Sequence, residues 1–95
     1  MRVLKTPNFA KQYKKLKPNQ KEDADTALRE IIQTPKIGVK KTGDLSGVLV
    51  HKFKMVNQLT LIAYAFEEGA LILIFIAIGP HENFYRGLKK SKKLP

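Results

Sequence analysis

The chain contains no cysteine among its 95 residues. This absence excludes disulfides, thiolate metal sites and a cysteine nucleophile, and it fits a reducing compartment. With only two histidines and scattered acidic residues, we expect no metal site and no other cofactor. Long apolar runs are also lacking. Met1–Lys5 has no signal-peptide core, and Ala70–Ile78 is too short to span a bilayer as a helix. We therefore expect a cytoplasmic protein without a membrane segment.

Acidic residues are few beside basic ones, with 8 Asp and Glu against 18 Lys and Arg, which gives a formal charge of +10. A charge of this sign and density favours polyanionic partners, namely RNA, DNA, an anionic membrane or an acidic protein. The alternative is a solvated basic surface that only keeps the protein soluble. We rank this alternative second, because lysines recur in every segment rather than only on exposed helix faces.

The length and the hydrophobic fraction of 43% indicate one domain with one core, spanning residues 1–95. Two helices are predicted in its N-terminal half. Thr6 and Pro7 form a helix-start signal, Pro18 is expected to end this first helix, and Asn19 to cap the second. The apolar face of the first helix comprises Phe9, Tyr13 and Leu16. The stripe of the second comprises Ala24, Ala27, Leu28, Ile31 and Ile32. The two helices should form an antiparallel hairpin.

The second half of the chain predicts a sheet. Alternating and β-branched stretches indicate strands over Val48–Val56, Leu59–Phe66 and Ala70–Ile78, and Arg2–Lys5 could add an edge strand. Residues 36–43 between the helices and the sheet form a basic, glycine-containing loop. A phosphate-binding loop is conceivable there, but no Walker or dinucleotide spacing is present. A surface connection that carries charge is the simpler interpretation.

A register follows if Asn57-Gln58 and Glu68-Gly69 form two-residue turns. One face of the sheet then carries Lys52 and Lys54 beside aliphatic side chains, namely Leu61, Ala63, Ile72, Ile74 and Ile76. The bulky opposite face should pack on the helices through Phe53, Met55, Ile62, Tyr64, Leu73 and Phe75. The aliphatic face needs a cover, and the predicted short helix at Glu82–Lys92 is small for that purpose. We therefore expect a partner protein, through an apolar helix, to dock there.

Four stretches together resemble the RelE/ParE superfamily of bacterial type II toxins. They are N-F-A-K-Q-Y-K-K-L (Asn8–Leu16), D-L-S-G-V-L-V-H-K-F-K (Asp44–Lys54), L-T-L-I-A-Y (Leu59–Tyr64) and I-G-P-H-E-N-F-Y-R-G-L-K (Ile78–Lys89). The resemblance implies an α+β, microbial-RNase-like fold, in which an N-terminal helical hairpin packs on a twisted antiparallel sheet with a short C-terminal helix. RelE-like members cleave messenger RNA in the ribosomal A site without a metal, whereas ParE-like members inhibit DNA gyrase. A cognate antitoxin holds both kinds inactive.

Metal-free RNA cleavage needs a base, an acid and cations that stabilise the phosphorane. Lys52 and Lys54 resemble the paired strand lysines of RelE, His81 lies where the family often has Arg or His, and Tyr85 follows one helical turn later. The candidate catalytic residues are therefore Lys52, Lys54, His81 and Tyr85. The candidate RNA-binding residues are Lys40, Lys41, Arg86, Lys89 and Lys90.

Each candidate also has a structural interpretation. The strand lysines could protect a sheet edge from aggregation, His81 could cap the last helix, and Tyr85 could be a packing residue. One departure from the RelE pattern is clear: the arginine of the middle strand is missing from residues 60–62, and Leu61 is expected beside Lys54 instead. Either Lys40, Lys41 or Arg86 then replaces it, or cleavage is weak, or the target differs. A ParE-like gyrase inhibitor and a basic nucleic-acid-binding module thus remain alternatives.

Overall fold

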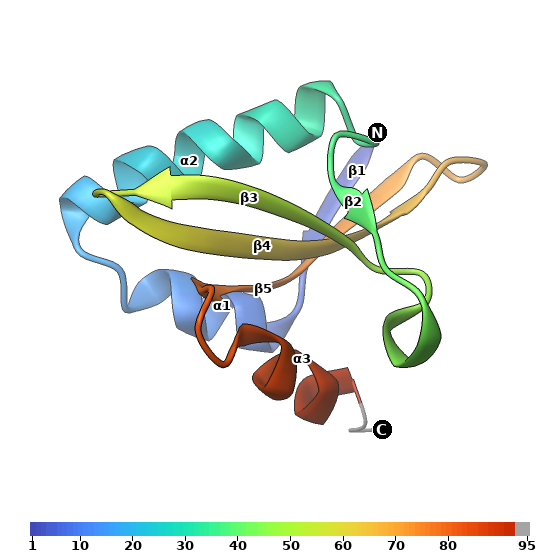
Figure 1. The fold of residues 1–95 in the computed structure, drawn as a ribbon. Helices are drawn as coiled ribbons and strands as arrows, with labels where there is room; N and C mark the ends of the chain where they lie inside the picture. Colours follow the sequence, from blue (N-terminus) through green and yellow to red (C-terminus); the bar gives the residue numbers. More distant parts are fainter. Residues whose placement is uncertain (93–95) are drawn as a thin grey trace.

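The computed structural model describes the backbone of residues 1–92 and the side chains of residues 1–89. Within that part of the chain, five strands form one sheet in the order β1–β5–β4–β3–β2. The strands are β1 (Arg2–Lys5), β2 (Val39–Lys40), β3 (Leu49–Met55), β4 (Gln58–Glu67) and β5 (Ile72–Pro80). Strand β1 pairs with β5 in parallel, and the other pairs are antiparallel. The result is a twisted antiparallel sheet with one parallel edge strand (Figure 1).

Three helices and one short 3-10 turn accompany the sheet. They are α1 (Pro7–Lys14), α2 (Pro18–Gln33), the 3-10 turn η1 (Gly43–Leu45) and α3 (Phe84–Lys92). Thr6 caps α1 as predicted, because its hydroxyl oxygen accepts from the Phe9 N–H at 3.1 Å. The prediction for Pro18 was wrong: it is the first residue of α2, where a missing N–H costs nothing, and Lys17 is the N-cap. No helix within residues 1–92 is long and apolar enough to cross a membrane.

The main core lies between the helical hairpin and one face of the sheet. It unites the buried stripe of α2 with the bulky strand residues, namely Phe9, Ala24, Ala27, Ile31, Leu49, Met55, Ile62, Tyr64, Leu73, Phe75 and Ile78. Phe53 packs against this cluster and is partly buried. The predicted core face of the sheet is therefore confirmed. This core positions β3, which carries the candidate catalytic lysines on the opposite face.

A second core covers much of the aliphatic face that we expected to be bare. It consists of Leu45, Val48, Val50, Leu61, Ala63, Ala77, Phe84 and Leu88. Phe84 and Leu88 lie one helical turn apart on α3, and Leu45 comes from η1. In Figure 1, α3 lies beneath the sheet together with the loop that carries η1. The premise of the partner prediction was thus wrong for Leu61 and Ala63, which two segments of the same chain cover, whereas Ile72 and Ile74 lie outside this core and are only partly buried.

Both predicted hairpin turns were misplaced. Met55 pairs with Gln58, so Val56 and Asn57 form the first turn, and both have positive φ angles. In the second hairpin Glu67 pairs with Ile72, and Leu71 rather than Gly69 takes the positive φ angle. Each turn shifts the pairing by two residues, so β3, β4 and the first part of β5 keep the faces that we predicted. A register shift between Ala63 and Tyr64 adds one more residue, so that Ala63 pairs with Ala77 instead of the predicted Ile74. The prediction was therefore wrong for the end of β5, where Ala77 lies in the second core and Ile78 in the main core.

Val56 is strained in this turn, because a β-branched residue at φ 49° is in the left-handed region. The turn is held from α2, where the Asp23 carboxylate accepts from the Val56 N–H at 2.8 Å. Val56→Gly should stabilise the protein by about 1 kcal/mol in urea unfolding, since it removes the strain and Val56 is 45% exposed. The control Asp23→Ala should destabilise by about 1 kcal/mol. A Val56→Gly protein less stable than the wild type would contradict this interpretation.

Tyr64 ties the loop after α2 to the sheet. Its buried hydroxyl donates to the Pro35 carbonyl at 2.9 Å and accepts from the Gly38 N–H at 2.8 Å. Burial raises the pKa of the Tyr64 hydroxyl, although the hydrogen bond from Gly38 acts in the opposite direction. A β-carbon at Gly38 would lie 2.7 Å from this hydroxyl oxygen, so the close approach requires glycine. The contact fixes the start of the segment that leads to Lys40 and Lys41.

Candidate functional site

One row of residues crosses the sheet on the side of α3. Lys54 pairs with Leu59, and the Leu59 carbonyl accepts from the His81 N–H at 3.1 Å. Directly paired residues of antiparallel strands point to the same face, so His81 continues the row that Lys54 begins. With strands about 4.8 Å apart, the backbones of Lys54 and His81 are about 10 Å apart. Both side chains are exposed. A group the size of a phosphodiester fits between a lysine and a histidine at this separation.

Lys52 starts the neighbouring row and is also exposed. It pairs with Leu61, which pairs in turn with Gly79. Our expectation that Leu61 lies beside Lys54 was therefore wrong by two residues. More importantly, Leu61 is 0% exposed and belongs to the second core under α3. Leu61 is thus a packing residue in this protein.

His81 connects β5 to α3 through its backbone. Its carbonyl accepts from the Phe84 N–H at 3.3 Å, in the turn that precedes α3. The cap interpretation is correct to this extent, but it concerns the main chain. The imidazole is left exposed on the same side as the lysines. It is therefore accessible to a bound substrate.

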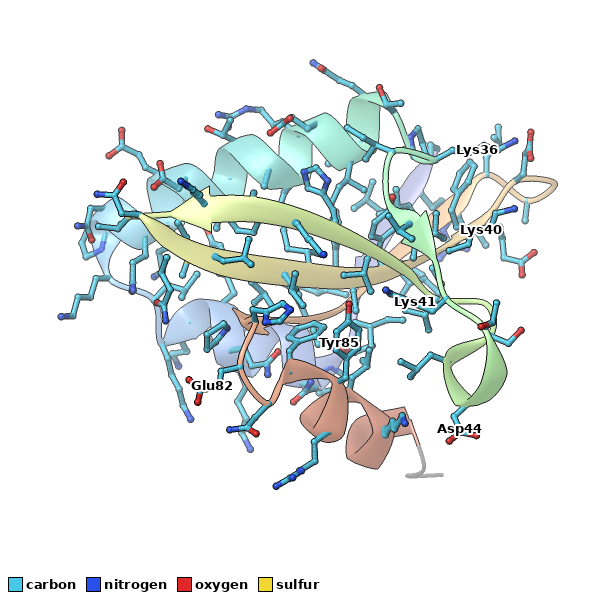
Figure 2. All side chains as sticks on the ribbon, in the orientation of Figure 1. Lys36, Lys40, Lys41, Asp44, Glu82 and Tyr85 are labelled. Carbon is cyan, nitrogen blue, oxygen red and sulfur yellow. The ribbon has the colours of Figure 1, made fainter. Side chains whose placement is uncertain are left out.

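Tyr85 lies on α3 with its ring half-buried, 5.6 Å from the Phe84 ring in an edge-on arrangement. The Lys41 ammonium is 5.0 Å from the centre of the Tyr85 ring. Figure 2 shows the Tyr85 side chain directed from α3 towards the strands, with Lys41 nearby. Tyr85 is thus both a packing residue and the partner of a cation.

Lys40 and Lys41 are neighbours in sequence, but the structure separates them. Lys40 pairs with Leu49 of the main core, whereas the Lys41 N–H donates to Val48, which belongs to the second core. Successive residues of an extended segment point to opposite faces. In Figure 2, Lys40 lies near Lys36, away from Tyr85. Of the two, only Lys41 reaches the side of the sheet that carries the candidate catalytic residues.

Lys89 on α3 approaches η1. Its ammonium lies 3.9 Å from the Asp44 carboxylate, and both side chains are exposed. A hollow of about 330 Å³ separates the two segments and is lined by Lys41, Thr42, Asp44, Leu45, Tyr85 and Lys89. Sequence reasoning missed Asp44, because its contact with Lys89 has no local signal. Arg86 is exposed, and the side chain of Lys90 lies outside the described residues.

These residues form a cationic face with one exposed imidazole and one partly buried phenol. Such a face can bind a phosphodiester, neutralise charge that develops on it and transfer protons. Among residues 1–89, no three histidine, aspartate or glutamate side chains gather closely enough to hold a metal ion. The described side chains therefore supply cations and proton carriers for chemistry, and no ligand set for a metal.

The sequence was also compared with models of protein families and with curated proteins. The family model of the ParE-like toxin of type II bacterial toxin–antitoxin systems matches residues 3–89. A search of curated protein sequences gave no significant match.

Solved structures of toxins are similar in fold. A double mutant of the E. coli toxin RelE in the free state has a TM-score of 0.72 at 17% identity, covering 98% of this chain and 97% of that one. The toxin–antitoxin complex RelBE of E. coli has a TM-score of 0.68 at 18% identity, and the match covers 85% of this chain and 96% of that one. The toxin–antitoxin complex RelBE2 of Mycobacterium tuberculosis has a TM-score of 0.71 at 13% identity, and the match covers 84% of this chain and 96% of that one. At these identities the likeness concerns the fold alone.

Proposed function

Because the chain belongs to the ParE-like toxins of type II bacterial toxin–antitoxin systems, we propose that it is a messenger-RNA endonuclease that acts on the ribosome. The observation that carries this proposal is the exposed row of Lys54, Leu59 and His81, with Lys52 in the next row on the same face. A toxin that binds only a protein target needs no imidazole beside a pair of lysines. RNA cleavage without a metal needs both kinds of group.

The proposed reaction is an internal transesterification. The 2′-oxygen of one nucleotide attacks its own 3′-phosphorus, and the bond from phosphorus to the 5′-oxygen of the next nucleotide breaks. The products are a 2′,3′-cyclic phosphate and a 5′-hydroxyl. A base removes the 2′-hydroxyl proton, and an acid protonates the leaving 5′-oxygen. His81 is suited to one of these proton transfers, and Tyr85 assists. Lys52 and Lys54 stabilise the extra negative charge of the phosphorane.

Inhibition of DNA gyrase is the second candidate function. The observation that favours it is the burial of Leu61 on the middle strand, where the resemblance to RelE implies a phosphate-binding arginine. The two functions make different demands on the face of the sheet that carries Lys52 and Lys54, here called the lysine face. A nuclease needs the proton-transfer group His81, whereas a gyrase inhibitor needs only a contact surface.

A cognate antitoxin is the proposed protein partner. Support comes from family membership and from the similar folds of RelE chains solved in toxin–antitoxin complexes. Antitoxins of such systems are encoded beside their toxins. Co-expression with the product of the adjoining gene should therefore restore growth of cells that produce this protein. Continued growth arrest despite complex formation would count against neutralisation.

The nuclease proposal can be tested by inducing the protein in growing cells and mapping RNA 5′ ends. New 5′-hydroxyl ends should accumulate inside coding regions at a fixed position relative to the reading frame. The ends should disappear when translation initiation is blocked, because the proposed substrate is messenger RNA on the ribosome. If growth stops without new ends and purified gyrase loses supercoiling activity at micromolar toxin, the gyrase alternative replaces the proposal.

A further inference from the structure

We propose that the hollow between η1 and α3, here called the loop–helix pocket (Lys41, Thr42, Asp44, Leu45, Tyr85 and Lys89), binds one phosphodiester of single-stranded RNA. Lys41 and Lys89 are its two cationic ligands. The inference rests on the proposed function, since it assigns the pocket to the same RNA substrate.

Lys41 is held in place before any ligand arrives. Its N–H donates to the Val48 carbonyl at 2.9 Å, and its ammonium lies over the Tyr85 ring at 5.0 Å. The side chain is only half-exposed, so it loses less rotamer freedom on binding than a fully solvated lysine. Tyr85 is fixed in turn by the edge-on contact with Phe84 of the second core. The pocket therefore presents a pre-positioned cation, which favours binding of an anion.

Lys89 is held more loosely. Its distance of 3.9 Å from Asp44 is long for an ion pair, and the two side chains are 51% and 81% exposed. Such a pair contributes little and exchanges readily with solvent. A phosphodiester that enters the pocket can therefore take the place of the Asp44 carboxylate on Lys89. Asp44 is then a competitor for the cation, and its removal should strengthen binding.

The size and place of the pocket favour single-stranded RNA as the occupant. A volume of about 330 Å³ accommodates a group the size of one nucleotide. Tyr85 offers an aromatic surface beside the cations, and this combination is typical of sites for single strands. The pocket adjoins the second core, on the same side of the sheet as Lys52, Lys54 and His81. One flexible strand can thus contact the pocket while its next phosphates extend towards the lysine rows.

The test is a titration of the purified protein with a fluorescein-labelled 2′-O-methyl hexaribonucleotide, which cannot be cleaved because its 2′-oxygen is blocked. Lys41→Gln and Lys89→Gln should each weaken binding about tenfold at low salt and reduce the slope of log K against log salt by about 0.7. Asp44→Asn should tighten binding about threefold. The controls Lys14→Gln and Glu22→Gln change the same charges outside the pocket and should alter affinity less than twofold.

Opposite effects of the lysine and aspartate variants separate binding from misfolding, because a damaged fold would weaken all of them. Tyr85→Leu should lower the affinity by releasing Lys41. The proposal is overturned if the pocket variants match their controls, if the wild type does not bind the hexamer, or if a DNA duplex binds more tightly than the hexamer.

The proposed function can fail separately. Cleavage by the wild type on ribosomes, together with control-like binding by the pocket variants, would reject the pocket and keep the nuclease. The reverse result, with no cleavage but loss of hexamer binding in Lys41→Gln and Lys89→Gln, would keep the pocket as an RNA site and reject the nuclease.

Discussion

Leu61→Arg is expected to lower the free energy of unfolding by about 4 kcal/mol, and not to restore a missing catalytic group. The resemblance to RelE noted in the sequence would suggest this change, because it implies an arginine on the middle strand. In this protein Leu61 is 0% exposed and packs with Phe84 and Leu88 of α3. An arginine there loses the leucine contacts and either buries its charge or displaces the helix.

Leu59→Arg is the matched control for this prediction. Leu59 lies on the same strand and face, pairs with Lys54, and is 42% exposed. An arginine at this position can extend into solvent, so the change should alter stability by less than about 1 kcal/mol. Urea unfolding followed by circular dichroism measures both variants. A Leu61→Arg protein with wild-type stability and faster RNA cleavage would show that α3 does not cover this position.

Removal of the lysine face should abolish RNA cleavage without unfolding the protein. Lys52→Ala with Lys54→Ala is expected to slow cleavage about 10³-fold, by loss of phosphorane stabilisation. His81→Ala should slow it by about 10²- to 10⁴-fold, by loss of proton transfer. The three changes together should cost little more than the worst single one, because groups that act as a unit are not additive. Single-turnover cleavage of ribosome-bound messenger RNA measures these rates.

The control for these variants is Lys11→Ala with Lys14→Ala. These lysines are exposed on α1, and their replacement removes the same total charge as the replacement of Lys52 and Lys54. The control therefore measures how much binding weakens through general electrostatics alone. All variants should unfold within about 1 kcal/mol of the wild type, since every replaced side chain is exposed. Equal losses in the control and in the strand-lysine variant would reduce the role of Lys52 and Lys54 to net charge.

Helix faces and the faces of β3 and β4 were predictable, because they follow from the spacing of apolar residues within one segment, whereas the register shift between Ala63 and Tyr64 changes the face of the end of β5. The stripe that includes Ala24, Ala27 and Ile31 is buried in α2, and Phe84 and Leu88 are buried on α3. Element ends were less predictable. Pro18 both ends one apolar pattern and opens the next, and only the backbone shows which of the two it does.

Cross-strand partners and long-range contacts were not predictable. The first hairpin turns at Val56, a poor residue for positive φ, because Asp23 of α2 binds the Val56 N–H from 33 residues away. The burial of Leu61 likewise depends on Phe84 and Leu88, which come from another part of the chain. The separation of Lys40 from Lys41 required the register of β2 on β3. A pattern within one segment carries none of this information.

The most direct measurement of the proposed function uses purified components: ribosomes stalled with an empty A site on a defined messenger RNA, the purified protein, and primer extension to locate cleavage. The proposal predicts cleavage within the A-site codon that leaves a 5′-hydroxyl, and its loss in the variant with Lys52→Ala, Lys54→Ala and His81→Ala. Intact messenger RNA after prolonged incubation with the folded wild-type protein would contradict it, as would equal cleavage by that variant.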